Sequence, residues 1–197
     1  GAAGFIGSHL TDYLLNKGHS VIGIDSFNDF YNPAIKHQNI QNAQSNPNFQ
    51  LYEGSILDTS FLENIFKSHS ISGIIHLAAY AGVRPSIEHP HLYYSTNVTG
   101  TQNILDMAVK TKCPRILLAS SSSVYGNNEK VPFSESDPVD RPISPYAATK
   151  KMTEIMSYNY HYLHNTPIAC LRFFTVYGPR QRPEMAIHKF CKMSPSN

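Results

Sequence analysis

Two side chains that could exchange a proton lie four residues apart in the segment Tyr146-Ala-Ala-Thr-Lys150. On a helix this spacing places the phenol and the ammonium on one face, with Cβ atoms about 6 Å apart. A free phenol has a pKa of about 10 and is a poor base at neutral pH. A nearby cation favours the phenolate, and bringing its pKa down to about 7 takes about 4 kcal/mol. The same spacing occurs by chance in many helices, so a surface pair is the alternative interpretation.

The chain opens on the glycine-rich segment GAAGFIG, with Gly1, Gly4 and Gly7 at intervals of three. In a dinucleotide-binding turn, the first glycine makes a tight turn and the second lets the backbone approach a pyrophosphate. The third glycine allows the following helix to pack closely on the sheet, and the helix N-terminus presents free N–H groups to the anion. Small residues also mark ordinary turns, so the segment alone is weak evidence for a nucleotide.

Asp25 ends the next apolar run, close to the interval of about 20 residues expected for a ribose-binding acid. Its carboxylate could accept the 2′-hydroxyl of NAD and would repel the 2′-phosphate of NADP. The next basic residue along the chain is Lys36, so we expect no cation near Asp25. An aspartate that caps a loop turn is the alternative. The sequence predicts NAD as the cofactor, and its positive nicotinamide ring would be a second cation beside Tyr146.

Strands that alternate with helices must position these motifs. Short apolar runs predict strands over 21–25, 49–53, 73–79, 115–120 and 168–174. Apolar residues at helical spacing predict helices over 8–17, 57–68, 96–111 and 145–163. We expect the strand at 73–79, which is nearly all apolar, to be buried on both faces.

This alternation predicts a doubly wound α/β fold with a parallel sheet. A glycine turn that opens a helix should follow a strand, so we expect a fragment that lacks its first strand and most of a C-terminal substrate domain. We place the NAD-binding domain at 1–178 and the start of a substrate-binding region at 179–197.

Composition excludes several classes of protein. The 197 residues carry a net charge of +2 with 41% hydrophobic residues, which suits a folded domain and not a disordered chain. No basic run indicates a nucleic-acid partner, and no segment approaches the roughly 20 apolar residues that span a membrane. The cysteines, Cys113, Cys170 and Cys191, form no Cys-x-x-Cys pair, so we expect neither disulfides nor a metal. The expected location is the cytoplasm, with an anchor or signal before residue 1 left open.

Five segments together resemble the extended short-chain dehydrogenase/reductase family of nucleotide-sugar epimerases: GAAGFIG, HLAAYAGVRPS, LASSSSVYG, SPYAATK and LRFFTVYGPR. The resemblance covers nearly the whole chain and is closest to UDP-glucuronate 4-epimerases. It implies that Tyr146 is the catalytic base and acid and that Lys150 holds both Tyr146 and the nicotinamide ribose. It also implies that Ser121 hydrogen-bonds the reacting hydroxyl and that Ser123 lies near the sugar.

The resemblance further implies a set of residues around the cofactor. Phe5 and Ile6 would line the pyrophosphate, and the rest of the cleft would be lined by Leu77, Ala78, Ala79 and Asn97. Relatives often have an aspartate that binds the adenine amino group where this chain has Ser55, followed by Ile56. A hydroxyl would make a weaker contact there, which puts cofactor affinity in doubt more than cofactor identity.

One position separates the possible reactions. Sugar dehydratases and decarboxylases that resemble this pattern place an acid immediately before VYG, where this chain has Ser123. Elimination of water therefore has no evident acid, which leaves inversion at C4 with all atoms retained. Arginine forks suit a diphosphate and a uronate carboxylate, so Arg84 and Arg182 are candidate substrate ligands. The resemblance implies that Thr175 and Arg182 bind the uronate carboxylate. Solvated loop charges are the alternative for Arg180 and Arg182.

The predicted function is NAD-dependent conversion of UDP-glucuronate to UDP-galacturonate through a transient 4-keto sugar, by a homodimer. The alternatives are a UDP-glucose/galactose 4-epimerase and a non-catalytic NAD-binding module. We expect this fragment to be inactive alone, because residues that clamp the uridine should lie largely beyond it. His76, inside an apolar strand, is expected to be a core residue with its hydrogen bonds satisfied.

Overall fold

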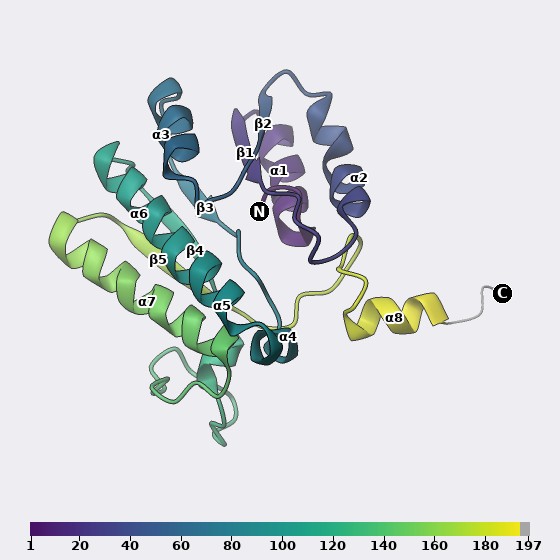
Figure 1. Ribbon diagram of the computed structural model, residues 1–197, viewed down its shortest axis with the longest axis vertical. Coiled ribbons are helices and arrows are strands. Elements are labelled where there is room, and N and C mark those ends of the chain that lie inside the picture. Colours follow the sequence, from purple (N-terminus) through teal and green to yellow (C-terminus); the bar gives the residue numbers. More distant parts are fainter. Residues whose placement is uncertain (194–197) are drawn as a thin grey trace. The chain divides into compact units, whose positions relative to one another are not determined.

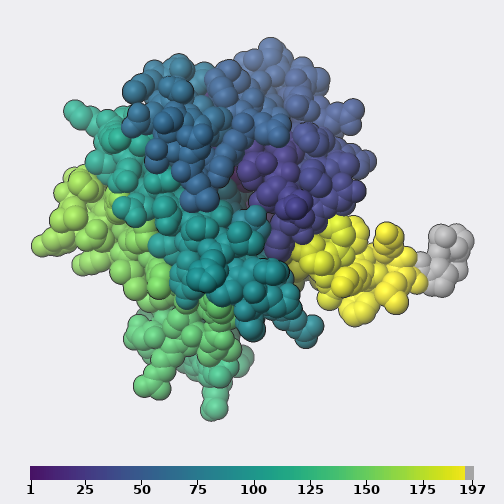
Figure 2. Space-filling model, viewed as in Figure 1, coloured from purple at the N-terminus to yellow at the C-terminus, as the bar shows by residue number. Residues whose placement is uncertain are grey.

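The computed structural model describes residues 1–193, which form two compact units (Figure 1). Unit 1 contains residues 1–55 and the segment from Thr175 onward, and unit 2 contains residues 56–174. In Figure 2 unit 1 is purple to dark blue and yellow, and most of unit 2 is teal to green. All strands of both units pair in parallel, with helices between successive strands. This is the Rossmann-like α/β architecture that the sequence predicted.

Unit 1 is a two-stranded sheet with flanking helices. Strand β1 (Val21–Asp25) pairs with β2 (Phe49–Glu53) along its whole length. Helices α1 (Phe5–Asn16) and α2 (Pro33–Gln44) pack on one another and on these strands, and α8 (Ala186–Met193) ends the described chain. The buried core consists of Ala3, Leu15, Phe27, Ile40 and Ala43.

Helix α2 was not predicted, because few of its residues are apolar. Its start is nevertheless marked in the sequence by Asn32 and Pro33. The Asn32 side chain accepts a hydrogen bond of 3.0 Å from the Ala34 N–H, and proline suits the first helical position. Only a narrow stripe that includes Ile40 and Ala43 is buried.

Unit 2 contains a three-stranded sheet in the order β3-β4-β5, formed by Ile74–His76, Ile116–Ser121 and Ile168–Phe173. The longer helices are α3 (Thr59–Ser68), α6 (Gly100–Lys110) and α7 (Pro145–His164). Shorter helical segments are α4 (Val83–Glu88), α5 (Pro90–Tyr93), the π-helix η1 (Tyr94–Thr99) and the 3-10 helix η2 (Ser122–Tyr125). The predicted helix at 96–111 thus consists of the end of the π-helix η1 followed by α6.

The two faces of the sheet in unit 2 differ in burial. Ile116 and Leu118 of β4 pack among residues of α6 and α7 and are 1% and 2% exposed. Leu117 on the opposite face is 36% exposed, and Ile75 of β3 is 40% exposed. The prediction that strand 73–79 is buried on both faces is therefore wrong for Ile75. An apolar run does not reveal whether one or both faces of a sheet are covered. The alternation of buried and exposed side chains along β4 does reveal it.

The division into units differs from the predicted boundary between residues 178 and 179. The chain returns to unit 1 at Thr175, where Gln181 is buried and its side chain donates to the Val176 carbonyl over 3.0 Å. The predicted boundary separated cofactor binding from substrate binding rather than packing units, and it stays a prediction.

Candidate active site

The glycine turn of unit 1 lies against the end of β1. The Ala2 N–H donates to the Ile24 carbonyl over 3.1 Å, and the Gly4 N–H donates to the Gly1 carbonyl over 3.3 Å. A Cβ at Gly7 would lie 2.0 Å from the Gly1 carbonyl oxygen, so only glycine lets α1 approach the turn this closely. No side chain caps α1 at Gly4. The first N–H groups of α1, beside the half-buried Phe5 and Ile6, are therefore available to an anion. A helix start of this kind can bind a pyrophosphate.

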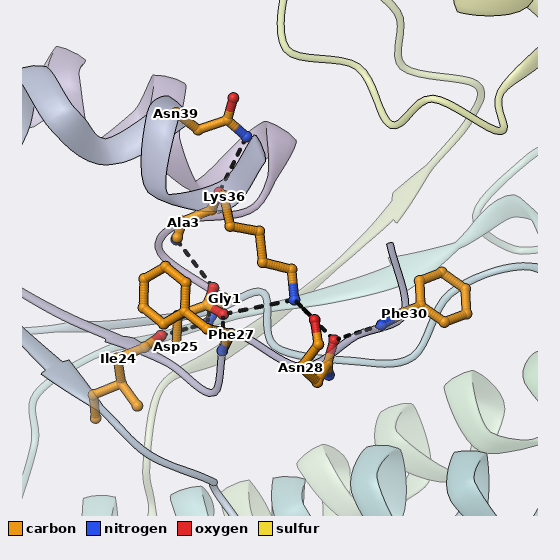
Figure 3. A network of polar contacts seen from close by, with 9 residues as sticks. All are labelled: Gly1, Ala3, Ile24, Asp25, Phe27, Asn28, Phe30, Lys36 and Asn39. Carbon is orange, nitrogen blue, oxygen red and sulfur yellow. Dashed lines mark hydrogen bonds and ion pairs between the residues drawn. The ribbon is translucent and has the colours of Figure 1, made fainter. Parts of the chain in front are cut away.

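Asp25 connects this turn to the loop that follows β1 (Figure 3). One carboxylate oxygen accepts the Ala3 N–H and the other accepts the Phe27 N–H, each over 3.0 Å. The residue is 6% exposed. Asp25 thus caps a loop turn, as the alternative interpretation stated. Each oxygen retains a second lone pair, so the carboxylate can still accept a ribose hydroxyl.

Lys36 corrects one prediction about Asp25. Its ammonium lies 4.0 Å from an Asp25 oxygen and donates to the backbone carbonyl and side-chain oxygen of Asn28 over 2.9 and 2.8 Å (Figure 3). The expectation that no cation lies near Asp25 is therefore wrong, because α2 folds Lys36 back over the strand end. Burial lowers the pKa of Lys36, and the charge of Asp25 opposes that effect.

This pairing changes what the site can bind. The negative charge of Asp25 is partly compensated, so charge alone excludes a 2′-phosphate less strongly than the sequence suggested. An acceptor and a donor 4.0 Å apart suit a hydroxyl group, which can donate to the carboxylate and accept from the ammonium. Lys36 is thus the residue near the predicted ribose site that the sequence missed, and the Asn32-Pro33 helix start was the signal for it.

Two predicted substrate ligands, Thr175 and Arg182, also belong to unit 1. Thr175 is exposed. Arg182 pairs with Glu184 over 3.1 Å, and its guanidinium lies 5.5 Å from the centre of the Phe30 ring. Arg180 pairs with Asp12 over 2.7 Å. Both arginines are half-buried and partnered, so they are not the freely solvated loop charges of the alternative interpretation.

In unit 2, Tyr146 and Lys150 occupy the first turns of α7, which begins at a defined cap. The Ser144 side chain accepts the Ala147 N–H over 3.1 Å, and Pro145 occupies the first turn. The Lys150 ammonium lies 6.0 Å from the centre of the Tyr146 ring, so both side chains share one face of the helix, as the four-residue spacing predicts. The Tyr93 ring meets the Tyr146 ring edge-on at 6.1 Å. Helix start and ring packing together fix the position of the phenol.

Lys150 is buried at the carboxyl end of β4. Its ammonium donates to the Ala119 carbonyl over 2.8 Å, and the residue is 6% exposed. Burial lowers the pKa of Lys150 to about 8, because the charged form loses its hydration. A lysine of this kind can hold a positive charge close to a phenol in a region with little water.

Ser121 ends β4, two residues after Ala119, and Ser123 lies in η2, which follows the strand. The Ser121 side chain accepts the Ser123 N–H and donates to the Ser123 hydroxyl, both over 3.2 Å. Unit 2 therefore brings together Ser121 and Ser123 and connects Lys150 to the same strand. A phenol, an ammonium and hydroxyl groups there are suited to proton transfer at a carbinol.

Asn97 has a supporting position. It is 1% exposed, exchanges two hydrogen bonds with the Tyr80 backbone and donates to the Thr149 hydroxyl over 3.1 Å. It thus fastens the loop after β3 to α7 between Tyr146 and Lys150. Its amide is used within the protein, so what it offers the predicted cofactor cleft is the shape of that loop.

The remaining predicted residues have less distinctive positions. Leu77, Ala78 and Ala79 follow β3 and are half-buried, Ser55 is half-buried after β2, and Ile56 is buried under Gly100. Arg84 is exposed on α4. His76 is buried and contacts the Thr101 hydroxyl over 3.0 Å, which confirms a satisfied core histidine. Burial lowers the pKa of His76 to about 3.

Comparison with known proteins identifies the class of protein that has this fold and these motifs. A family model described as GDP-mannose 4,6 dehydratase matches residues 1–196, and the chain belongs to this family. Within it the chain is 44% identical over 192 residues to a UDP-glucuronate 4-epimerase of Thermodesulfobacterium geofontis. It is 45% identical over 193 residues to UDP-glucuronate 4-epimerase 4 of Arabidopsis thaliana. The alignments cover 98% of this chain but 59% and 44% of these relatives.

Solved structures give the same similarity. The UDP-glucuronic acid 4-epimerase of Bacillus cereus, in complex with UDP-glucuronic acid and NAD, matches with a TM-score of 0.89 and 40% identity. That match covers 97% of this chain and 60% of the other. A dTDP-glucose 4,6-dehydratase of Streptomyces venezuelae, with NAD bound, matches with a TM-score of 0.87 and 32% identity, over 97% and 59% of the two chains. The chain thus spans less than two thirds of the proteins it resembles.

Residues 1–193 contain neither a membrane-spanning helix nor a cluster of metal ligands. No helix there is long and apolar enough to cross a membrane. No group of three or more histidine, cysteine, aspartate or glutamate side chains there could hold a metal ion.

The lowered pKa of Lys150 predicts a pH dependence of stability. Between about pH 8 and the ordinary lysine value of 10.5, the native state loses a proton that the unfolded chain still holds. Because the unfolded state then binds more protons, the free energy of unfolding should rise with pH across this window. In urea unfolding, Lys150→Met should show a smaller rise than wild-type protein, because Lys36, whose pKa burial also lowers, still contributes. The variant should be more stable at pH 7 by about 1 kcal/mol or more.

The matched control is Lys67→Met, which removes an exposed lysine of α3 and should keep the wild-type pH slope. Identical slopes for wild-type protein and Lys150→Met would contradict a lysine that is buried at the cost of stability.

Proposed function

We propose that the protein containing this chain is an NAD-dependent 4-epimerase that converts UDP-glucuronate to UDP-galacturonate. The observation that carries the proposal is the contact of the buried Lys150 with the Ala119 carbonyl, two residues before Ser121 on β4. It connects the helix that carries the candidate base to the strand end that carries the candidate hydroxyl. The relatives named UDP-glucuronate 4-epimerase support the choice of reaction.

The residues of unit 1 suit NAD. The turn from Gly1 to Gly7 would receive the pyrophosphate, and Asp25 with Lys36 would bind hydroxyls of the adenine ribose. When bound, NAD supplies the acceptor and donor of hydride that the inversion of a carbinol centre requires. The NAD that accompanies the Bacillus cereus and Streptomyces venezuelae proteins supports this cofactor.

The residues of unit 2 would handle the proton. The Lys150 ammonium stabilises Tyr146 as phenolate, and the phenolate takes the proton of the sugar 4-hydroxyl. Ser121 hydrogen-bonds the same hydroxyl and holds it near the phenol. After the 4-keto sugar has rotated in the site to present its other face, Tyr146 returns the proton. Ser123 offers no acid for loss of water, so the sugar keeps all its atoms.

Arg182 and Thr175 are the proposed ligands of the uronate carboxylate, and Arg84 is a proposed ligand of the diphosphate. In the structure the Arg182 guanidinium pairs with the Glu184 carboxylate. The carboxylate of a uronate substrate could take the place of Glu184 in this pair. A neutral sugar would lack that group. A UDP-glucose/galactose 4-epimerase is therefore the second outcome that the activity assay must test.

We also propose that the protein is a homodimer of the cytoplasm. Helix α7 exposes an apolar stripe in which Ile155, Tyr158 and Tyr162 are 56%, 70% and 77% exposed. A stripe of this kind on a long helix suits burial against a second copy. Light scattering after size exclusion should give twice the chain mass, and Ile155→Glu should halve it, whereas Gln38→Glu on α2 should not. A monomeric wild type would contradict the dimer.

The free thiols suit a reducing compartment such as the cytoplasm, and fractionation of the source cells tests this location.

The activity itself is tested with the full-length protein that contains this chain, UDP-glucuronate and NAD. We expect UDP-galacturonate with no net release of NADH, and faster turnover of the uronate than of UDP-glucose. Tyr146→Phe should lower kcat on the order of 10³-fold, because it removes the group that takes and returns the proton. Product analysis by NMR measures both rates.

Tyr13→Phe is the control, since it removes the hydroxyl of an exposed tyrosine in α1. It should keep wild-type turnover. Rapid epimerisation by Tyr146→Phe would refute the mechanism, and preference for UDP-glucose would favour the neutral-sugar epimerase. Binding of NAD without any turnover would favour the non-catalytic module.

A further inference from the structure

A shielded ion pair lies one helical turn beyond Lys150. Glu154 continues the four-residue spacing of Tyr146 and Lys150 on α7, and Arg172 lies on β5. Arg172 donates through Nε to one Glu154 oxygen over 2.9 Å and through Nη2 to the other over 3.0 Å. The two side chains are only 18% and 11% exposed. This two-point geometry fixes the orientation of both groups as well as their distance.

The same pair reaches both ends of the segment that carries the candidate hydroxyls. The Ser120 hydroxyl donates to Glu154 over 2.6 Å, at the end of β4. Arg172 Nη1 donates to the Tyr125 hydroxyl over 3.2 Å, and its guanidinium carbon lies 5.0 Å from the centre of the Tyr125 ring. Ser121 and Ser123 lie between these two anchors.

Other contacts hold the far side of this arrangement. Arg172 Nη1 also donates to the Glu135 carbonyl over 3.2 Å, in the loop after η2. The buried Tyr125 ring stacks on Phe133 at 4.7 Å. The guanidinium thus connects β5 to α7, to η2 and to the following loop.

The pair is charged in the folded protein. Burial alone would raise the pKa of Glu154, but hydrogen bonds from Arg172 and Ser120 outweigh it and the pKa is lowered. The hydrogen bond to Glu154 in turn raises the pKa of Arg172. Because each charge is compensated by the other, the pair provides rigid contacts without adding a net charge beside Lys150.

We propose that Glu154 and Arg172 are positioning residues that set the place of Ser121 and Ser123 relative to Tyr146 and Lys150. The proposal rests on the proposed function, in which Tyr146 and Ser121 must meet the same sugar hydroxyl. The helix and the strand end that supply these groups share Glu154 as a common contact. A displacement of about 1 Å between them can lower a rate on the order of 100-fold.

The test compares Arg172→Lys, which keeps the charge but loses the fork, with Glu154→Gln, which keeps the shape but loses the charge. Tyr125→Phe removes a single hydrogen bond and serves where the larger changes impair folding. The control, Lys110→Met, breaks the ion pair of Lys110 with Glu63, which has similar length at 3.0 Å but is exposed. Amide hydrogen exchange and steady-state kinetics are measured on each variant of the full-length protein that contains this chain, with NAD present.

We expect exchange over residues 120–126 to rise on the order of 10-fold in Arg172→Lys and Glu154→Gln, with α3 unchanged. We expect kcat to fall on the order of 100-fold with KM within about 2-fold of wild type, and a smaller fall in Tyr125→Phe. The double variant should be little worse than either single variant, since both remove one interaction. Lys110→Met should match wild type in every measurement.

A wild-type kcat per folded molecule in Arg172→Lys and Glu154→Gln, with only a lower melting temperature, would overturn the proposal. The ion pair would then contribute to stability alone. An equal loss of kcat in Lys110→Met would also overturn it. Hydrogen exchange needs no turnover, so unchanged exchange over 120–126 refutes the positioning role even in a protein without epimerase activity. Absence of wild-type epimerisation would instead refute the proposed function.

Discussion

A lysine ammonium held out of water is the constraint on which the candidate active site depends. Desolvation makes the charge of Lys150 costly, and the Ala119 carbonyl is the acceptor that offsets part of this cost. The contact also joins α7 to β4. Tyr146, one turn before Lys150, and Ser121, two residues after Ala119, thus lie on elements that this hydrogen bond connects.

The two units divide the requirements of the proposed reaction between them. Unit 1 offers a glycine turn and a carboxylate paired with Lys36, which suits the neutral and anionic parts of a dinucleotide. Unit 2 offers the phenol, the ammonium and the hydroxyls, held by Asn97 and by the Glu154–Arg172 pair. In the proposed function, recognition and proton transfer thus depend on different local networks, which substitutions can perturb separately.

Much of this arrangement was predictable, for identifiable reasons. The strands at 21–25 and 49–53 have their predicted bounds, because an apolar run between turns leaves little choice. The position of Lys36 could not be predicted, because α2 begins at a side-chain cap and has only a narrow apolar stripe, without a strong helical periodicity in the sequence. The exposure of Ile75 was also missed, because the composition of one strand does not reveal what covers the sheet. Individual contacts such as Arg172 with Glu154 depend on which strands become neighbours, information that lies outside any single segment.

The most direct test is the ionisation of Tyr146 itself, followed by ultraviolet difference spectroscopy with NAD bound. Subtracting the titration of Tyr146→Phe from that of wild-type protein isolates this one phenol. We expect a tyrosine that ionises near neutral pH, and a shift to much higher pH when Lys150 is replaced by methionine. A phenol that ionises only where free tyrosine does, with or without Lys150, would contradict the central claim.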